Sequence, residues 1–205
     1  DAFHGYHMGV TAENVATKFQ VTREDQDKFA LKSQEKAIKA IKANKMIDEI
    51  VNFKIKSKKA EIDFNKDEHP REGINMEGLT RLKPVFQKDG TVTAGNASGI
   101  NDGAAAVALM SEEEAKKRNL KSLVTIKSWA SCGVEPALMG TGPIPATKKV
   151  LDLSGWKVED VDLFEVNEAF AAQSIAVLKT LGIPDEKVNV NGGAIALGHP
   201  IGASG

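Results

Sequence analysis

Residues 161–205 read VDLFEVNEAFAAQSIAVLKTLGIPDEKVNVNGGAIALGHPIGASG, and this stretch decides the fold class. Residues 161–166 have the apolar pattern of a strand, residues 167–181 that of a helix, and residues 188–190 that of a second strand. Gly182 follows the predicted helix, at the position where glycine commonly ends one. Strands that alternate with helices predict a layered α/β architecture.

Further strands and helices are predicted upstream of this stretch. Residues 104–110 are small and apolar, as in a tightly packed strand, and the serine that opens residues 111–118 predicts a capped, charged helix. Residues 124–130 place apolar side chains on one side of a strand, and residues 143–153 predict a helix that Gly155 ends. No internal repeat or low-complexity tract is present in the sequence.

The first 98 residues are more polar and irregular. Thr11 is a candidate cap for a helix over residues 12–19, and Thr22 with Asp25 resembles a capping box. Behind that box, small and apolar residues recur at steps of three and four. This spacing predicts a long surface helix to about Asn44 with one buried stripe.

The chain then loses its helical pattern. Residues 50–55 alternate apolar and polar side chains, as a half-buried strand does. Residues 56–81 are rich in charge, glycine and turn-forming residues, and they predict a loop.

Composition excludes several classes of function. The 205 residues carry a net charge of −1, so no overall basic field would attract nucleic acid or an acidic membrane. No apolar run approaches the length of a membrane span. Cys132 is the only cysteine, which rules out an internal disulfide and favours a reducing compartment. The chain begins at Asp1 and stops in a glycine-rich run, so we expect a fragment, and a targeting segment could lie upstream.

The glycine-rich run over residues 192–205 contains the first candidate functional residue. Five of its fourteen residues are glycine, which suggests close backbone approach or unusual dihedral angles. His199 lies between Gly198 and Pro200, and the proline disfavours helical geometry at His199. A histidine on such a loop is well placed to act as a base or hydrogen-bond donor. The alternative is a surface histidine in a tight turn.

Asn167 lies where a predicted strand ends and a predicted helix begins. Asparagine is a favoured helix cap, and the residues alone favour that interpretation. The functional alternative is an amide that positions a water or a ligand at the layer edge, where α/β sites usually form.

Other reactive side chains give weaker signals. Cys132 has no electropositive neighbours in sequence, so we interpret it as structural. His4 and His7 have a spacing that could bind metal, but no carboxylate or thiolate accompanies them, and no metal site is predicted. Ser98 could bind a ligand or only form a turn, and Arg71 could meet a phosphate or only water.

Six strings follow one another along the whole chain. They are HMG with TAEN in residues 7–14, TAGNASG in 93–99, NDGAAA in 101–106, GTGP in 140–143, NEAFA in 167–171, and the glycine-rich run from 192. In this order they resemble the thiolase family, most closely its acetyl-CoA acetyltransferase branch.

The resemblance implies the thiolase fold, a layered αβαβα arrangement of two similar halves with a loop domain inserted into the first. Residues 1–98 would be most of the loop domain, which binds coenzyme A. Residues 99–120 would end the first half, and residues 121–205 would form a truncated second half. The family usually forms homotetramers built from tight dimers, so the chain itself is the expected partner.

The implied reaction is a reversible Claisen condensation of two acetyl-CoA to acetoacetyl-CoA and coenzyme A, through an acyl-cysteine. His199 matches the histidine that takes the proton from the nucleophilic cysteine and helps to bind the thioester oxygen. Asn167 matches the asparagine that holds a water, the second donor of that oxyanion hole. The nucleophilic cysteine is expected upstream of Asp1 and a second catalytic cysteine beyond Gly205, so this chain alone is expected to be inactive.

The resemblance makes coenzyme A a substrate, with no cofactor required. Ser98 resembles the serine at the pantetheine arm, and Arg71 the arginine near the adenine and phosphate end. Met139 lies where the family shapes the acyl pocket, and a bulky residue there suits short acyl chains. The expected coenzyme A-binding residues are His7, Met8, Arg71, Phe86, Ala94, Ser98, Met139 and Phe170.

Three alternatives stay open. One is a degradative 3-ketoacyl-CoA thiolase with wide chain-length tolerance. Another is a thiolase-like protein that binds acyl-CoA or lipid without catalysis. The third is a decarboxylating condensing enzyme, which is expected to show two histidines, or a His and an Asn, opposite one cysteine. This alternative fits the sequence less well than a thiolase does. Cytoplasm is the expected compartment, with mitochondria second, and neither nucleic acid nor a membrane is an expected partner.

Overall fold

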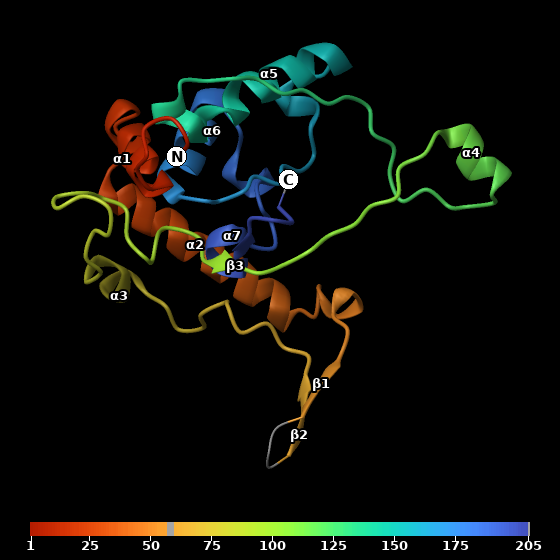
Figure 1. Ribbon diagram of the computed structural model, residues 1–205, viewed down its shortest axis with the longest axis horizontal. Helices are drawn as coiled ribbons and strands as arrows, with labels where there is room; N and C mark the ends of the chain where they lie inside the picture. Colours follow the sequence, from red (N-terminus) through yellow and green to blue (C-terminus); the bar gives the residue numbers. More distant parts are fainter. Residues whose placement is uncertain (57–59, 205) are drawn as a thin grey trace.

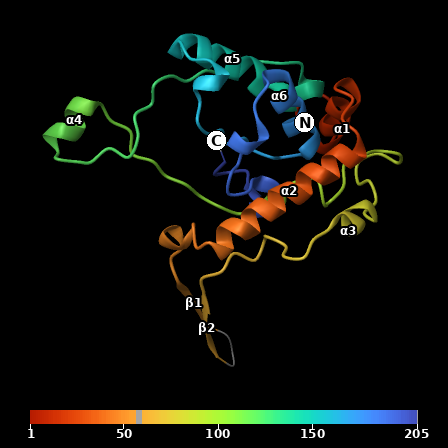
Figure 2. The same cartoon turned by 180° about the vertical axis from the view of Figure 1, so that it is seen from behind.

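The computed structural model describes residues 1–56 and 60–204, and most of its helices gather into one body (Figure 1). Helix α2 (Arg23–Lys42) packs against α6 (Ala171–Leu181) and α7 (Ala194–Leu197), and α1 (Met8–Lys18) packs against α6. Figure 2 shows the same arrangement from behind, with α2 running along the body. Segments from both ends of the sequence therefore share one core.

Apart from α5, the remaining elements are short. They are η1 (Ile47–Glu49), β1 (Phe53–Lys56), β2 (Glu61–Phe64), α3 (Met76–Thr80), β3 (Ile100–Asn101), α4 (Glu112–Lys117), η2 (Pro136–Thr141), α5 (Pro143–Ser154), η3 (Val158–Asp160), η4 (Asp185–Lys187) and β4 (His199–Pro200). Among the described residues, no helix is both long and apolar enough to cross a membrane.

The core between α2, α6 and α7 is built partly from small residues. Ala30 and Ala171 are fully buried beside Ile175 and Ile195, and Phe19 and Phe29 pack against this cluster. Small side chains allow the helices to approach closely, and the larger ones fill the remaining space. This core supports the loop that follows α7, where His199 lies.

Helix α2 begins where the sequence predicts. The Thr22 hydroxyl accepts a hydrogen bond from the Asp25 N–H, and the Asp25 carboxylate accepts one from the Thr22 N–H, both at 3.1 Å. The capping box is therefore confirmed. The predicted buried stripe is present as well, since Ser33, Ala37 and Ala40 are buried. The bonds from Thr22 also hold the pKa of the Asp25 carboxyl below its ordinary value.

Replacing Thr22 with alanine is expected to lower the free energy of unfolding by about 1 kcal/mol, the usual loss for an N-cap. Because the folded pKa of Asp25 is depressed, its stabilisation is complete above the unfolded pKa and is lost as pH falls through the folded one. Urea unfolding of the full-length protein near pH 7 and in acid measures both effects. The Thr22→Ser control keeps the acceptor and should retain wild-type stability. If Thr22→Ala lowers the free energy of unfolding by the same amount in acid as at pH 7, the cap is not coupled to the ionised Asp25 carboxylate.

The predicted start of the first helix is wrong. Helix α1 begins at Met8, and the His7 imidazole Nδ1 accepts from the Gly9 N–H at 3.0 Å as its N-cap. Thr11 lies buried inside the helix, where its hydroxyl donates to the Met8 carbonyl at 2.6 Å. The sequence pattern missed this cap because histidine is not among the residues that commonly form one.

The start of α4 and the ends of α5 and α6 agree with the sequence prediction. Ser111 caps α4 by accepting from the Glu114 N–H at 3.2 Å. Gly155 and Gly182 end α5 and α6 in the left-handed conformation, with φ of 69° and 66°. These three predictions are confirmed, because each depends on chemistry within one turn of helix.

The predicted start of α6 at residue 167 is wrong. The helix begins at Ala171, with Phe170 as its N-cap. Ala97 faces Phe170 in an antiparallel bridge, and the Ser98 N–H donates to the Ala169 carbonyl at 3.0 Å. This pairing with a distant segment keeps the residues after Asn167 out of the helix.

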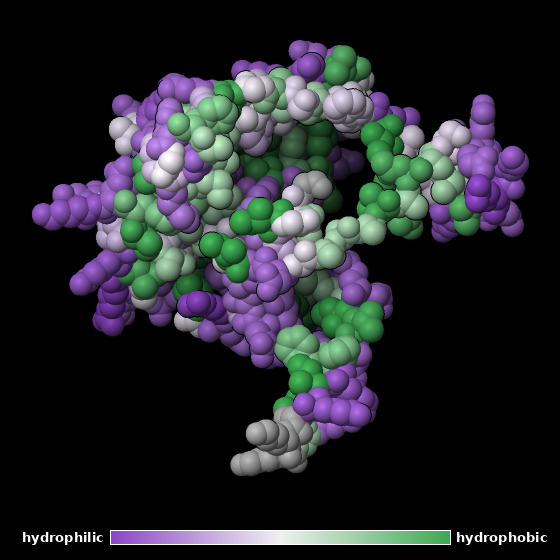
Figure 3. All heavy atoms as spheres, in the orientation of Figure 1, coloured by the Kyte–Doolittle hydropathy of each residue, from purple (hydrophilic) through white to green (hydrophobic). Residues whose placement is uncertain are grey.

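Most of the predicted strands find no neighbouring strand among the described residues. Residues 161–166 and 188–190 meet at a single parallel bridge, between Phe164 and Val188. Residues 104–110 and 124–130 form no strand and are largely exposed. Figure 3 shows hydrophobic residues along the two segments that run to and from α4. A strand needs a hydrogen-bonded neighbour, so apolar patterning alone does not create one.

The predicted strand over residues 50–55 exists as β1, but its burial was predicted wrongly. All four residues of β1 are exposed, as are those of its antiparallel partner β2, and the hairpin projects from the body (Figure 1). β2 and α3 both lie in the stretch predicted as loop. Within α3, Leu79 is fully buried, which anchors this otherwise polar region.

Candidate functional site

The two candidate catalytic residues lie side by side. Asn167 Nδ2 and His199 Nε2 are 3.3 Å apart, although 32 positions separate them in sequence. Asn167 is exposed and His199 is half-buried, so both polar tips can be reached from solvent. The geometry makes a small polar edge with one amide and one imidazole.

His199 is held by its backbone and by Ser204. Its strand β4 pairs in parallel with β3, and the His199 N–H donates to Asn101 Oδ1 at 3.0 Å. On the other side of the ring, His199 Nδ1 lies 2.9 Å from the Ser204 hydroxyl. The Ser204 oxygen can accept a proton from Nδ1, and in that tautomer the Nε2 lone pair faces Asn167, as a general base requires.

Gly198 is required for this arrangement. Its φ is 97°, a conformation that L side chains rarely adopt. An added Cβ would lie 2.5 Å from Asn101 Oδ1, so a side chain at this position would displace the group that binds the His199 backbone.

Asn167 is held from the following helix. Its carbonyl accepts from Gln173 Nε2 at 3.2 Å, and Gln173 Oε1 accepts from the Phe170 N–H at 3.0 Å. Asn167 is not the cap of α6, so the cap interpretation is wrong. Its amide is left free of helix capping and faces His199.

Several of the predicted coenzyme A-binding residues form a continuous row. The His7 and Phe86 rings stack with centroids 4.6 Å apart, and Phe86 meets Phe170 edge-on at 6.1 Å. Met8 is adjacent to His7 and is 38% exposed. Ser98 joins the row through its backbone contact with Ala169. This row leads to the segment that carries Asn167.

The other predicted binding residues are more scattered. Arg71 and Ala94 are exposed, and the Arg71 backbone N–H donates to Gln34 Oε1 at 2.9 Å. Met139 is 44% exposed on η2. Its neighbour Gly140 packs closely against Gln173, the residue that binds the Asn167 carbonyl. Met139 is thereby connected to the Asn167 side of the site. The roles of all these residues stay predictions.

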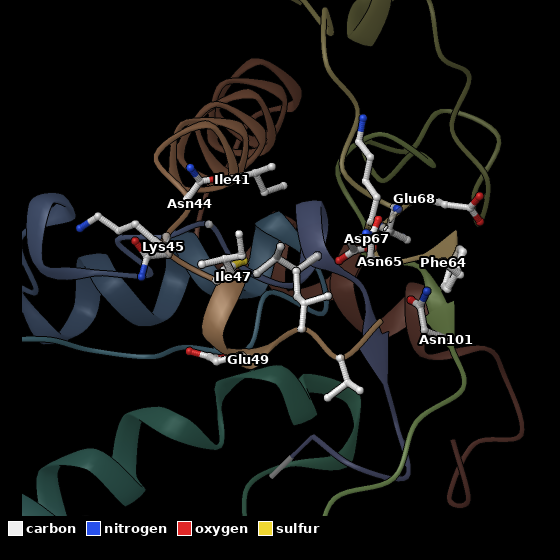
Figure 4. Close-up of a pocket in the computed structure, with 18 of the residues that line it drawn as sticks. Ile41, Asn44, Lys45, Ile47, Glu49, Phe64, Asn65, Asp67, Glu68 and Asn101 are labelled. Carbon is white, nitrogen blue, oxygen red and sulfur yellow. Dashed lines mark hydrogen bonds between the residues drawn. The ribbon is translucent and has the colours of Figure 1, made fainter. Parts of the chain in front are cut away.

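A hollow of about 1090 Å³ lies beside the site rather than in it. It is bounded by the end of α2, by η1 and by residues 64–69 (Figure 4). Asn101 lines the hollow, whereas Asn167 and His199 do not. The candidate site is therefore the open polar edge, with Asn101 between the two.

Sequence reasoning missed three residues that support the site. Asn101 and Ser204 contact His199, and buried Glu168 lies next to Asn167. All three lie within the six strings that carried the resemblance, but no local pattern assigned them a partner. Cys132 is half-buried, and its interpretation as structural stays a prediction. In the part of the chain that the structure describes, no group of three metal-ligating side chains could hold a metal ion.

Two family models match the sequence. The thiolase N-terminal domain matches residues 1–113, and the thiolase C-terminal domain matches residues 120–205. The acetyl-CoA acetyltransferase of Rhizobium meliloti (strain 1021) is 59% identical over 205 residues, covering 100% of this chain and 52% of the relative. The cytosolic acetyl-CoA acetyltransferase of Mus musculus is 58% identical over 207 residues, with 100% and 52% covered. The chain thus spans about half the length of the curated relatives it matches.

Solved structures show the same similarity. The Bacillus anthracis acetyl-CoA acetyltransferase superposes with a TM-score of 0.93 at 52% identity, covering 99% of this chain and 52% of that one. Human mitochondrial 3-ketoacyl-CoA thiolase superposes with a TM-score of 0.90 at 44% identity, covering 100% and 51%. The layered α/β fold class expected from the sequence is therefore confirmed.

Proposed function

Because the chain belongs to the thiolase family and has its fold, we propose that the full-length protein is an acetyl-CoA acetyltransferase. It would join two acetyl-CoA molecules into acetoacetyl-CoA and coenzyme A, and also run the reverse cleavage. The names of the relatives support this assignment. The observation that carries it is the contact between Asn167 and His199 on an open polar edge.

The chemistry explains why such a pair is needed. Removing a proton beside a thioester carbonyl places negative charge on the oxygen of the resulting enolate. Hydrogen-bond donors already aimed at that oxygen lower the barrier, and one such donor is typically worth about 2.7–4 kcal/mol. In this proposal His199 Nε2 donates once it has gained a proton, and a water held by Asn167 gives the second bond.

His199 has a second role in the proposal. A cysteine nucleophile is weak until a neighbouring base takes its proton. The Nε2 lone pair, kept available by the Nδ1 contact with Ser204, can accept it. The nucleophile and a second catalytic cysteine would come from parts of the protein outside these 205 residues. Acylation and deacylation would then follow one another, which gives ping-pong kinetics.

The row of His7, Phe86 and Phe170, with Ser98 beside it, is the proposed path of the pantetheine arm. Apolar and aromatic walls with a few polar groups are usual for such a ligand. Arg71 would meet the adenine and phosphate end. Residues 1–98 would form most of the loop domain, with the two thiolase halves divided at about residue 120.

The remainder of the full-length protein would cover the exposed apolar segments. Residues 104–110 and 124–130 are patterned as strands and find no neighbouring strand among the described residues. We assign their partners to the half of the relatives' length that this chain does not span. A homotetramer and a cytoplasmic location complete the proposal, and the word cytosolic in the name of the mouse relative favours the location.

A degradative 3-ketoacyl-CoA thiolase is the second candidate, favoured by the similarity to the human mitochondrial structure. Rates on acetoacetyl-CoA and on longer 3-ketoacyl-CoA thioesters separate the two. A strong preference for acetoacetyl-CoA supports the proposal. If the rate on a long 3-ketoacyl-CoA equals the rate on acetoacetyl-CoA, the protein is the degradative enzyme instead.

Met139 is expected to set this chain-length preference. Replacing it with alanine removes several heavy atoms from the acyl pocket, and pocket changes of this size are worth about 1–3 kcal/mol. The kcat/KM for a six-carbon 3-ketoacyl-CoA, relative to acetoacetyl-CoA, should therefore rise about tenfold or more. Met110 is equally exposed at 44%, and Met110→Ala is the control that should leave the ratio unchanged. If Met139→Ala leaves this ratio of kcat/KM values unchanged, Met139 does not line the acyl pocket.

A further inference from the structure

Glu168 is a buried carboxylate directly beside Asn167. Glu168 as a whole is only 2% exposed. Three donors bind it: the Ser33 hydroxyl at 2.6 Å, Asn189 Nδ2 at 2.8 Å and the Ile195 N–H at 3.2 Å. Glu168 does not line the open edge where Asn167 and His199 meet, so a different role is needed to explain it.

The partners of Glu168 come from three separate parts of the chain. Ser33 lies on α2, and its hydroxyl oxygen also accepts from the Gly193 N–H at 3.1 Å. Asn189 holds the segment before Asn167, since its side chain accepts from the Val166 N–H and donates to the Val166 carbonyl, both at 2.8 Å. The carboxylate thus connects α2, the segment that carries Asn167, and the run that leads to His199.

Close packing makes this connection rigid. A Cβ added to Gly193 would overlap the Glu168 carboxylate. A Cβ added to Gly192 would lie 2.5 Å from Ala37 Cβ on α2. The glycine-rich run therefore lies directly against the carboxylate and against α2, with no room for side chains between them.

The energetics favour a single arrangement of the cluster. A buried carboxylate is costly unless hydrogen bonds satisfy it, and these three donors supply that compensation together. Lys36 lies nearby on α2 and donates to the Val188 carbonyl at 2.6 Å. Burial lowers the pKa of Lys36, while the carboxylates of Asp185 and Glu168 act in the opposite direction. Moving any one segment would leave a buried polar group unpaired.

We propose that Glu168 is the positioning residue of the Asn167–His199 pair, acting through Ser33, Asn189 and the backbone of Ile195. It touches no substrate. It fixes the separation of the amide and the imidazole by holding the segment that precedes each of them. This inference rests on the proposed thiolase activity, because it concerns the geometry of that oxyanion hole.

The Glu168→Gln variant of the full-length protein is the first test. Glutamine keeps the volume, but its NH₂ group would face one of the donors and cost at least one bond. We expect kcat for cleavage of acetoacetyl-CoA to fall about 10- to 100-fold, as small misplacements of catalytic groups do. KM for coenzyme A should change little, because no proposed binding residue is altered. A kcat that stays at the wild-type level would overturn the proposal.

A double-mutant comparison separates positioning from simple destabilisation. If Glu168 acts through the pair, adding Glu168→Gln to an Asn167→Ala enzyme should lower kcat by less than about twofold. If it acts on the fold alone, the two losses multiply, and the proposal fails. Glu13→Gln is the matched control. Glu13 is a second buried carboxylate, and it binds the N–H groups of Thr91 and Val92 at 2.8 Å. Its variant should lose thermal stability while keeping kcat.

Ser33→Ala keeps the test decisive if Glu168→Gln does not fold. Ser33 is on α2, lies 135 positions from Glu168, and binds the carboxylate through one hydroxyl. Its loss should lower kcat several-fold with KM unchanged, and an unaltered kcat would overturn the proposal. Wild-type protein is assayed first in every series. Absence of wild-type cleavage would reject the proposed function itself, whereas active wild type with an unaffected Glu168→Gln would reject only the role of Glu168.

Discussion

Alanine in place of His199 is expected to abolish most of the activity of the full-length protein. A general base contributes about 10²–10⁴-fold, and one oxyanion donor about 10²–10³-fold. His199 holds both roles in the proposed mechanism, so kcat for coenzyme A-dependent cleavage of acetoacetyl-CoA should fall by about 10⁴-fold or more. Initial rates followed by the loss of acetoacetyl-CoA measure it.

The control for this variant is another histidine. His4 is exposed and its ring contacts Tyr6, so His4→Ala should keep the wild-type rate. Binding of coenzyme A to His199→Ala should be retained, since none of the predicted binding residues changes. A His199→Ala enzyme that retains a tenth of the wild-type kcat would show that another group is the base.

Alanine at Gly192 is expected to have the largest effect on stability. Its φ is 90°, and the new Cβ would lie 2.5 Å from Ala37 Cβ and 2.8 Å from the Ala37 backbone. Overpacking costs about 1–3 kcal/mol and the left-handed backbone about 1–2 kcal/mol more. The free energy of unfolding should therefore drop by about 2–5 kcal/mol. Denaturant unfolding measures this loss, and the soluble yield should fall with it.

Gly182→Ala is the matched control for that variant. Gly182 has a φ of 66°, but a Cβ there would meet nothing within 4 Å. It should lose only the backbone contribution, about 1–2 kcal/mol. Equal losses in the two variants would mean that the close approach of residue 192 to α2 is not what stabilises this part of the fold.

The helix ends with a local cause were the most predictable features of the fold, whereas the starts of α1 and α6 were predicted wrongly. The Thr22 and Asp25 capping box, the Ser111 cap and the glycines at 155 and 182 each act within a turn of helix. Strands were the least predictable, since each one needs a partner from elsewhere. Residues 104–110 have an apolar pattern yet form no strand, because no other described segment pairs with them.

The same distinction applies to the candidate site. Composition and spacing alone gave His199 and Asn167 as candidates without a reaction, and only the family resemblance supplied their roles. The cap interpretation of Asn167 failed because residues 96–98 pair with residues 169–171, a contact that no local pattern reports. Glu168 was missed for the same reason, since its partners Ser33 and Asn189 are distant in sequence.

In the proposed mechanism, the full-length protein transfers acetyl groups on coenzyme A with Asn167 and His199 at its oxyanion hole. The most direct test is to incubate it with acetoacetyl-CoA and coenzyme A and to measure the acetyl-CoA formed. We expect two acetyl-CoA for each acetoacetyl-CoA consumed, with ping-pong kinetics. Tight binding of coenzyme A without any acetyl-CoA formed would contradict this mechanism, and would identify a thiolase-like protein that binds acyl-CoA without turning it over.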